Sequence, residues 1–312
     1  MAEMMAAREA YGKALLALGE ENPHVVVLDA DLSKSTKTAY FGAKYPRRFF
    51  NMGIAEANLM GTAAGLAAAG KIPFASTFAV FAVGRAFEQI RNSIAYPRLN
   101  VKIVATHAGI TVGEDGGSHQ AVEDVALMRA VPNMTVLVPA DGEETRQAVL
   151  AAAQYNGPVY IRLGRMETPL LFGADYHFEI GKANVLTTGN DAAVLANGLL
   201  VQVALEAARE LAEEGINVSV VNVASVKPLD AETIVRVAGE TGAIVTAEEH
   251  SVIGGLGSAV AELLGEKRPA PMVRVGLRDT FGESGSPAEL LEKYGLSKAA
   301  VKKAVGEVLA RK

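Results

Sequence analysis

The sequence predicts an α/β protein in which short buried strands alternate with helices and pair into parallel sheets. Short runs rich in β-branched residues, such as 25–28 and 101–105, are typical of buried strands. Between them lie stretches with apolar residues at helical spacing, and several strands end in polar loops. Strands that alternate with helices in this way pair in parallel, and the helices cover both faces of the sheet.

Composition limits the classes of function. The 312 residues are 50% hydrophobic and 21% charged, which is enough to bury a large core and favours two domains. The net charge of -5 leaves no basic stripe, so we expect no nucleic-acid and no membrane partner, although single arginines still suit small anions. The chain has no cysteine, and no cationic, apolar leader segment is recognisable, so we expect a cytoplasmic protein without disulfides or thiolate chemistry.

The first half of the chain reads as one α/β unit. A helix over 6–18 feeds a strand over 24–28, which ends in the polar loop 29–35, and open α/β sheets bind ligands at the carboxyl ends of their strands. The remaining predicted elements follow in order: strand 72–77, helix 78–94, strand 101–105, strand 134–138, a helix with Asp141 as its cap, and strand 157–163.

One acid is expected in a costly place. If a helix begins near Ile54, Glu56 shares a face with Leu59, Met60 and Ala63, the positions that should face the core. Burial disfavours the charged form of a carboxyl group, so Glu56 should hold its proton unless a partner pairs with it. Spacing leaves an alternative open, in which Glu56 only complements the helix dipole from the first turn.

The loop 106–120 is rich in glycine and contains two histidines, His107 and His119. Glycine lets a backbone approach a ligand closely, and loops with fixed ends often carry function. The alternative is a solvated turn in which Ser118 caps a helix that begins at about Gln120. The other three histidines, at 24, 177 and 250, are each expected to be structural.

Two arginines lie at the carboxyl end of the predicted strand 157–163, Arg162 within its last residues and Arg165 just beyond it. The planar guanidinium of an arginine at the carboxyl end of a strand suits a phosphate. Alternation places Arg162 and Arg165 on different sides, so only one of them is expected to bind an anion, and a structural salt bridge is the alternative for either.

The alternation of predicted strands and helices becomes irregular after residue 166. We therefore predict a first domain over 1–170, a linker over 171–188 and a second domain over 189–312. The expected strands of the second domain are 191–196, 216–221, 243–247 and 271–275, and the expected helices are 199–214, 230–239, 255–265, 287–294 and 297–310. The glycines at 254–257 lack the full dinucleotide-binding spacing and are explained by a tight turn into a helix.

Several short motifs together resemble one family. They are Ala30-Asp31-Leu32 with Ser35, Gly53-Ile54-Ala55-Glu56, Ser76-Thr77-Phe78 with Phe81, Gly113-Glu114-Asp115-Gly116 with His119-Gln120, Pro132-Asn133, and Pro139-Ala140-Asp141. In order and spacing, from Arg8 to the last helix, the chain resembles the carboxyl-terminal half of transketolase, a thiamine diphosphate enzyme. The resemblance implies a pyrimidine-binding parallel-sheet domain followed by a smaller α/β transketolase C-terminal domain.

The resemblance also implies an activity, the transfer of a two-carbon ketol unit from a ketose phosphate to an aldose phosphate. In the family, the acid at the position of Glu56 bonds to a ring nitrogen of the cofactor's aminopyrimidine and promotes its imino form. Phe78 and Phe81 are then expected to flank the aminopyrimidine, and Asp31 to lie close to the cofactor. For the two phenylalanines, ordinary core packing is the alternative.

The same resemblance assigns residues to the substrate. His107, Asp115 and His119 are expected to contact sugar hydroxyls, with the histidines assisting proton transfer. Arg8, Ser35 and Arg165 are expected to hold the sugar phosphate. For Arg8, the alternative is a solvated helix face.

Two departures stand out. Ala57 replaces a common glutamine, and the family's Gly-Asp-Gly, which helps to hold Mg²⁺ and the diphosphate, does not occur in this chain. We therefore expect no metal ligands here and a separate N-terminal subunit that supplies them, in an α2β2 assembly. The rival interpretations are a 2-oxoacid dehydrogenase β subunit, half of a deoxyxylulose phosphate synthase, and a scaffold without catalytic function.

Overall fold

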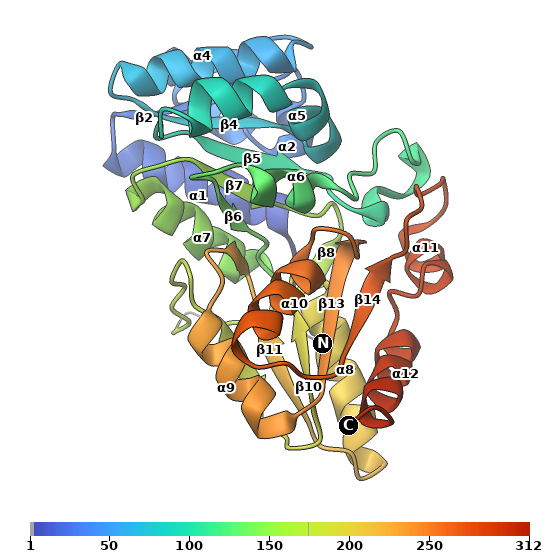
Figure 1. The fold of residues 1–312 in the computed structure, drawn as a ribbon. Helices are drawn as coiled ribbons and strands as arrows, with labels where there is room; N and C mark the ends of the chain where they lie inside the picture. Colours follow the sequence, from blue (N-terminus) through green and yellow to red (C-terminus); the bar gives the residue numbers. More distant parts are fainter. Residues whose placement is uncertain (1–2, 174) are drawn as a thin grey trace.

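The computed structural model describes residues 3–173 and 175–312, which form two α/β units, each built on its own sheet (Figure 1). In Figure 1 the blue-to-green first domain lies above the yellow-to-red second domain. The predicted α/β class with parallel sheets is confirmed.

The first domain contains a sheet with the strand order β12-β6-β7-β5-β4-β2-β3. Its parallel strands are β2 (Val25–Asp29), β3 (Phe49–Asn51), β4 (Ile72–Phe78), β5 (Lys102–Thr106), β6 (Thr135–Leu137) and β7 (Val159–Arg162). The antiparallel edge strand β12 (Ser225–Lys227) comes from the second half of the chain. Because the other strands are parallel, the loops that follow them all emerge at one edge.

Helices cover both faces of this sheet because successive strand side chains point to opposite sides. Val25 and Val27 of β2 pack with α1 (Ala7–Glu21) and α7 (Gly142–Gln154). Val26 and Leu28 pack on the other face. That face is covered by α4 (Glu56–Ala68), α5 (Ala79–Arg85), a π-helix (Gln89–Ala95) and α6 (Asp124–Ala130).

Short elements complete the first domain. They are α2 (Ser33–Thr36), α3 (Ala39–Lys44), 3-10 turns over Pro46–Arg48 and Ile110–Asp115, and a two-stranded antiparallel ribbon of β1 (Met4–Ala6) and β8 (Glu167–Pro169). No helix among the described residues is both long and apolar enough to cross a membrane.

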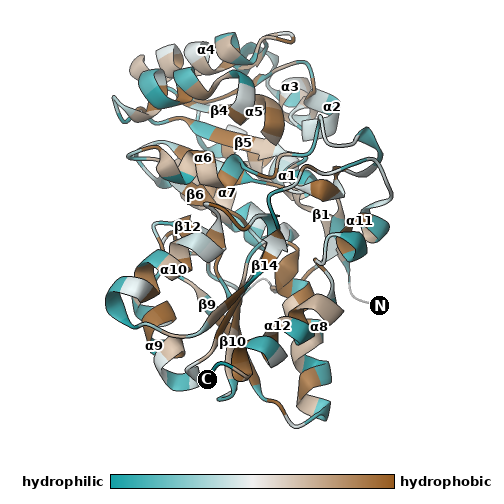
Figure 2. Ribbon diagram, turned by 45° about the vertical axis from the view of Figure 1, so that its right-hand side comes forward, coloured by the Kyte–Doolittle hydropathy of each residue, from teal (hydrophilic) through white to brown (hydrophobic). Residues whose placement is uncertain are grey.

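The second domain has a sheet of five strands in the order β14-β13-β10-β11-β9. The strands are β9 (Asn184–Thr187), β10 (Ala192–Ala196), β11 (Val218–Asn222), β13 (Ile244–Ser251) and β14 (Met272–Leu277). β9 lies within the range predicted as linker. Two helices, α8 (Leu200–Glu213) and α12 (Lys298–Leu309), pack on one face, and α9 (Ala231–Thr241) and α10 (Leu256–Lys267) pack on the other. Figure 2 shows the hydrophobic strand β10 in brown among helices that carry teal stretches.

Two predicted elements differ from the structure. The single helix expected over 78–94 is divided into α5 and the π-helix, because the backbone leaves helical geometry at Ala86. The alternative for the loop, a helix from about Gln120 capped by Ser118, is wrong, since α6 begins at Asp124. Gln120 is instead buried in the loop, where its side chain amide donates hydrogen bonds to backbone oxygens.

Candidate functional site

Two ring side chains meet where neighbouring strands end. Phe78 is the last residue of β4, and His107 directly follows β5, with which β4 pairs in parallel. The two rings stack with their centroids 3.8 Å apart. The parallel register therefore brings two residues that the sequence separates by α5 and the π-helix into direct contact.

Two further rings extend this contact. Phe81, on the first turn of α5, lies 5.8 Å from Phe78 in a stacked arrangement, measured between centroids. His119 approaches Phe81 edge-on at 5.3 Å. We call these four residues, Phe78, Phe81, His107 and His119, the aromatic cluster. It unites both predicted histidines with both predicted phenylalanines.

The predicted acid joins this cluster through an arginine. Glu56 is the first residue of α4 and is 5% exposed, so the expected burial is confirmed. Its Oε1 accepts a hydrogen bond from Arg85 Nη1 at 2.9 Å. The guanidinium of Arg85 lies over the Phe81 ring, 4.2 Å from its centroid. Arg85 was not among the predicted site residues, although its position four residues after Phe81 places both on one helix face.

Two arginines, Arg8 and Arg165, lie close enough to His107 for their charges to act on it. Arg8 Nη1 donates to the backbone oxygen of Ser35 at 3.1 Å. Its Nε is buried and has no hydrogen-bond partner among the described residues. Burial lowers the pKa of Arg8, and the nearby charge of Arg165 lowers it further. A buried N–H without a partner is costly, so this donor is suited to an acceptor that comes from outside the chain.

Arg162, the last residue of β7, and Arg165, three residues further on, have different surroundings. Arg162 is 5% exposed, and its Nε lies 2.9 Å from the buried carboxylate of Asp124, so it has the structural role. Arg165 is half-buried, donates to the backbone oxygen of Val112 and lies 3.8 Å from Asp115. Of the two, Arg165 is the one beside the glycine loop.

His107 is held as a neutral ring. Burial lowers the pKa of His107 to about 3, and the charges of Arg8 and Arg165 act in the same direction. Its Nδ1 lies 2.9 Å from the hydroxyl of Thr106. A neutral imidazole offers one donor and one acceptor, which suits contact with hydroxyl groups.

The loop after β2 carries the remaining predicted residue. Asp31 is exposed, has a positive φ of 65° and accepts a hydrogen bond from Asn51 Nδ2 at 2.9 Å. The buried carboxylate of Asp29 accepts from Leu32 N at 2.6 Å and from the hydroxyl of Thr36 at 2.7 Å, which fixes the path of this loop. Within the part of the chain that the structure describes, Asp31 forms no hydrogen bond or ion pair with a member of the aromatic cluster.

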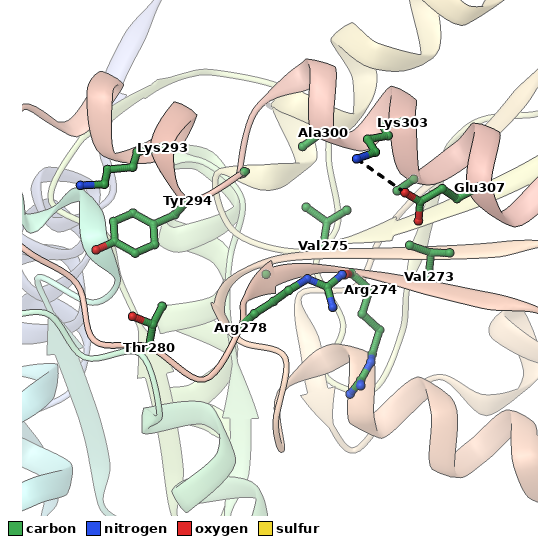
Figure 3. A pocket seen from close by; sticks show the side chains of 13 residues that line it. Val273, Arg274, Val275, Arg278, Thr280, Lys293, Tyr294, Ala300, Lys303 and Glu307 are labelled. Atoms are coloured by element: carbon green, nitrogen blue, oxygen red, sulfur yellow. Dashed lines mark hydrogen bonds and ion pairs between the residues drawn. The ribbon is translucent and has the colours of Figure 1, made fainter.

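A separate pocket of about 340 Å³ opens in the second domain between β14, α11 (Pro287–Lys293) and α12 (Figure 3). None of its lining residues is a predicted site residue. Two of its cations have partners close by, since Lys303 lies 3.9 Å from Glu307 and Arg278 donates to the backbone oxygen of Arg274 at 3.0 Å. Within the described ranges, no three His, Asp or Glu side chains are grouped to hold a metal ion.

Comparison with known proteins identifies both domains. Residues 3–169 match the family described as "Transketolase, pyrimidine binding domain", and residues 181–301 match "Transketolase, C-terminal domain". A putative transketolase C-terminal section of Methanocaldococcus jannaschii is 49% identical over 97% of this chain and 96% of its own length. A 6-deoxy-6-sulfo-D-fructose transketolase subunit of a Clostridium species is 47% identical over 98% of this chain and 95% of its own length.

Solved structures agree with these matches. One, described as a split gene transketolase in an inactive β4 tetramer, is 62% identical, has a TM-score of 0.93 and covers 98% of this chain and 99% of its own. Transketolase from Leishmania mexicana is 28% identical with a TM-score of 0.85, and this chain covers 46% of it. The chain therefore belongs to the transketolase family and corresponds to the carboxyl-terminal half of its full-length members.

Proposed function

We propose that this chain is the C-terminal subunit of a two-chain transketolase. The complete enzyme would use thiamine diphosphate to transfer a two-carbon ketol unit from a ketose phosphate to an aldose phosphate. The observation that carries the proposal is the position of Glu56, a buried acid linked through Arg85 to the aromatic cluster. A buried acceptor beside flat aromatic rings suits a polar heterocycle.

The donor and acceptor set fits the pyrimidine end of this cofactor. We assign Phe78 and Phe81 to the faces of the aminopyrimidine and Glu56 to one of its ring nitrogens. Arg85 donates to Oε1 of Glu56, so we assign the second carboxylate oxygen to the cofactor. When bound, thiamine diphosphate supplies the electron sink for breaking a carbon–carbon bond. The role of this chain is to orient the aminopyrimidine ring and, through the hydrogen bond from Glu56, to favour its imino form. Asp31 is assigned a place close to the cofactor.

The sugar phosphate is assigned to the two histidines of the cluster and to the polar groups around His107. We assign His107, His119 and Asp115 to the sugar hydroxyls, with the histidines accepting or returning protons. The lowered pKa of His107 supports a neutral ring in this role. Arg8, Arg165 and Ser35 are assigned to the phosphate group. The unpartnered Nε of Arg8 supports this assignment because it is a buried donor that an anion would satisfy.

We assign the diphosphate and Mg²⁺ ligands to a separate N-terminal subunit, because this sequence contains no Gly-Asp-Gly. Relatives of the same length that are named as a C-terminal section or a subunit support two chains. The similar structure described as an inactive β4 tetramer supports the view that the partner is needed for activity. An α2β2 assembly is the symmetric arrangement we propose.

The matches favour ketol transfer over the rival 2-oxoacid dehydrogenase and deoxyxylulose phosphate synthase activities. Within transketolases, relatives of this chain are named for different sugars. One relative is named for 6-deoxy-6-sulfo-D-fructose, and another, 37% identical, is an apulose-4-phosphate transketolase subunit of Phocaeicola vulgatus. These sugars therefore belong in the first substrate panel.

The test is reconstitution. The chain is mixed with the candidate N-terminal subunit, thiamine diphosphate and Mg²⁺, and ketol transfer from xylulose 5-phosphate to ribose 5-phosphate is measured, with each chain alone as a control. We expect ketol transfer only when both chains are present. Activity of this chain without its partner, or oxidative decarboxylation of a 2-oxoacid by the complex, would contradict the proposal.

A variant separates catalysis from scaffolding. Glu56→Gln replaces the buried carboxyl group with an amide and should abolish turnover, while the complex still forms in size-exclusion chromatography. The matched control is Glu240→Gln, an exposed acid on α9 that pairs with Arg236 one helical turn away. Wild-type turnover by Glu56→Gln would favour a scaffold without catalytic function.

A further inference from the structure

We propose that Glu249, in the second domain, is a positioning residue that holds the substrate-contacting loop of the first domain in its working conformation. The inference rests on the proposed function, because that function assigns His107, Asp115 and His119 to the sugar. We call residues 107–119 the substrate loop. The second domain would thus take part in substrate binding without touching the substrate.

Glu249 reaches the substrate loop directly. It lies on β13, is 4% exposed and uses Oε1 to accept a hydrogen bond from the backbone N–H of Thr111 at 2.7 Å. The acid and the loop lie 138 residues apart in the sequence. A hydrogen bond from a backbone N–H to a carboxylate is among the stronger ones, particularly away from water.

The loop backbone is shaped to admit this carboxylate. A Cβ atom on Gly109 would lie 2.2 Å from the carboxyl carbon of Glu249, and Gly109 has a φ of 84°. Any other residue there would meet the carboxylate and also adopt an unfavourable backbone conformation. Gly109 and Glu249 are therefore matched to one another across the two domains.

Other contacts tie the same short segment. Gln120 Nε2 donates to the backbone oxygen of Ile110 at 3.1 Å and to that of Glu283, in the second domain, at 2.9 Å. Arg165 donates to the backbone oxygen of Val112. Figure 1 shows the green loop after β5 beside the red segment that precedes α11. The loop therefore lies between the two domains, with Glu249 holding its centre.

The tied segment lies between the residues assigned to the sugar. His107 precedes Gly109, and Asp115 follows Val112. Loss of the Glu249 carboxylate would leave the Thr111 N–H unpaired, and the segment would shift to satisfy it. A displacement of about 1 Å at a positioned group is enough to lower a rate by about 100-fold.

A neighbouring acid provides the matched control. Glu248 lies on the same strand, is 1% exposed, and accepts hydrogen bonds from the backbone N–H groups of Leu256 and Gly257 at 2.7 and 2.8 Å. Both donors belong to α10 of the second domain. A variant at Glu248 therefore removes an equally buried carboxylate without removing a hydrogen bond to the substrate loop.

The experiment compares Glu249→Ala, Glu249→Gln and Glu248→Ala in the reconstituted two-chain complex. The readouts are kcat, KM for the donor sugar phosphate, Kd for thiamine diphosphate, and amide hydrogen exchange of the peptide that contains Thr111. For Glu249→Ala we expect kcat/KM to fall by about 100-fold, in part through a higher donor KM. We also expect faster hydrogen exchange of the Thr111 peptide and an unchanged Kd for the cofactor. Glu249→Gln keeps an acceptor oxygen and should recover most of the activity, and Glu248→Ala should change neither donor KM nor exchange of the loop.

Equal effects of Glu249→Ala and Glu248→Ala on donor KM and exchange would overturn the proposal, as would unchanged exchange in Glu249→Ala. If Glu249→Ala does not fold, Gly109→Ala tests the same contact from the side of the loop. This variant should also raise the KM for the donor, and wild-type kinetics in it would contradict the inference. An inactive wild-type complex would refute the proposed function instead, and hydrogen exchange would still test the contact.

Discussion

The buried ion pair between Asp124 and Arg162 allows a stability effect to be worked out from the structure. Asp124 is fully buried, and its Oδ2 accepts from Arg162 Nε at 2.9 Å and from the hydroxyl of Tyr160 at 2.6 Å. Arg162 also donates to the backbone oxygen of Glu249 at 2.8 Å, so the pair lies where the two domains meet. The perturbation is Asp124→Ala, which removes the buried carboxylate and leaves Arg162 Nε and the Tyr160 hydroxyl without their acceptor.

The expected cost is large. Removing one member of a buried ion pair costs about 3–5 kcal/mol, because the remaining charge is uncompensated. A buried hydroxyl that loses its acceptor adds about 1–3 kcal/mol, although the two penalties overlap at one site. We therefore expect the free energy of unfolding to fall by about 4 kcal/mol, which for a chain of this size lowers Tm by roughly 10 °C.

The assay is urea unfolding followed by far-UV circular dichroism. The control is Glu240→Ala, which breaks the exposed pair with Arg236 and should cost less than about 1 kcal/mol. Replacing both partners, as Asp124→Leu with Arg162→Met, should regain much of the loss, because no uncompensated charge then remains. A loss below about 1 kcal/mol in Asp124→Ala, or a double variant less stable than it, would refute the reasoning.

Three further outcomes are expected. Burial lowers the pKa of His107 from 6.5 to about 3, so between these pH values the folded state binds fewer protons than the unfolded state. The free energy of unfolding should therefore fall as the pH drops through this window. In urea titrations at several pH values, His107→Gln should reduce this dependence on pH. Burial raises the pKa of Glu144 from 4.5 to about 7, so stability present at low pH is lost as pH rises through this window, and a slope unchanged by Glu144→Gln would exclude this source. Asp141 caps α7 by accepting from Glu144 N at 2.7 Å, and it also accepts from Leu171 N at 2.6 Å. Asp141→Ala removes both contacts and should lower the free energy of unfolding by about 2–3 kcal/mol in thermal unfolding. A loss below about 0.5 kcal/mol would count against the capping contact.

Local patterns predicted much of the fold. The apolar run 101–105 corresponds to β5, and the predicted burial of Leu59, Met60 and Ala63 with Glu56 is confirmed. These features follow from the geometry of one strand or one helix, where spacing decides which side chains share a face. The cap at Asp141 is confirmed for the same reason, since its side chain accepts from Glu144 N nearby.

Short and distant pairings were missed. β1, β3, β8, β9 and β12 were not predicted, because none has more than four residues and none lies in a longer apolar run that would mark it as a strand. β12 also leaves its own half of the chain and pairs antiparallel with β6 at the edge of the first sheet. A pairing of this kind depends on how two domains pack and has no local signal.

The candidate site shows the same division. The motifs indicated Glu56, the two phenylalanines and the two histidines, and the structure brings four of these residues into one aromatic cluster. The partner of Glu56 was not predicted, because Arg85 lies 29 residues away on another helix. Glu249 gave no signal either, since its contact crosses between domains.

The sequence by itself determined that strands and helices alternate, that Glu56 lies on an apolar helix face, and that a glycine loop with two histidines follows a strand. Only the tertiary structure decided that Arg162 is buried against Asp124 while Arg165 lies beside that loop, and that Glu249 of the second domain holds the loop. The reason is physical. Periodicity along the chain fixes which side chains share a face of one element, whereas the partner that meets each face depends on the packing of sheets and domains distant in sequence.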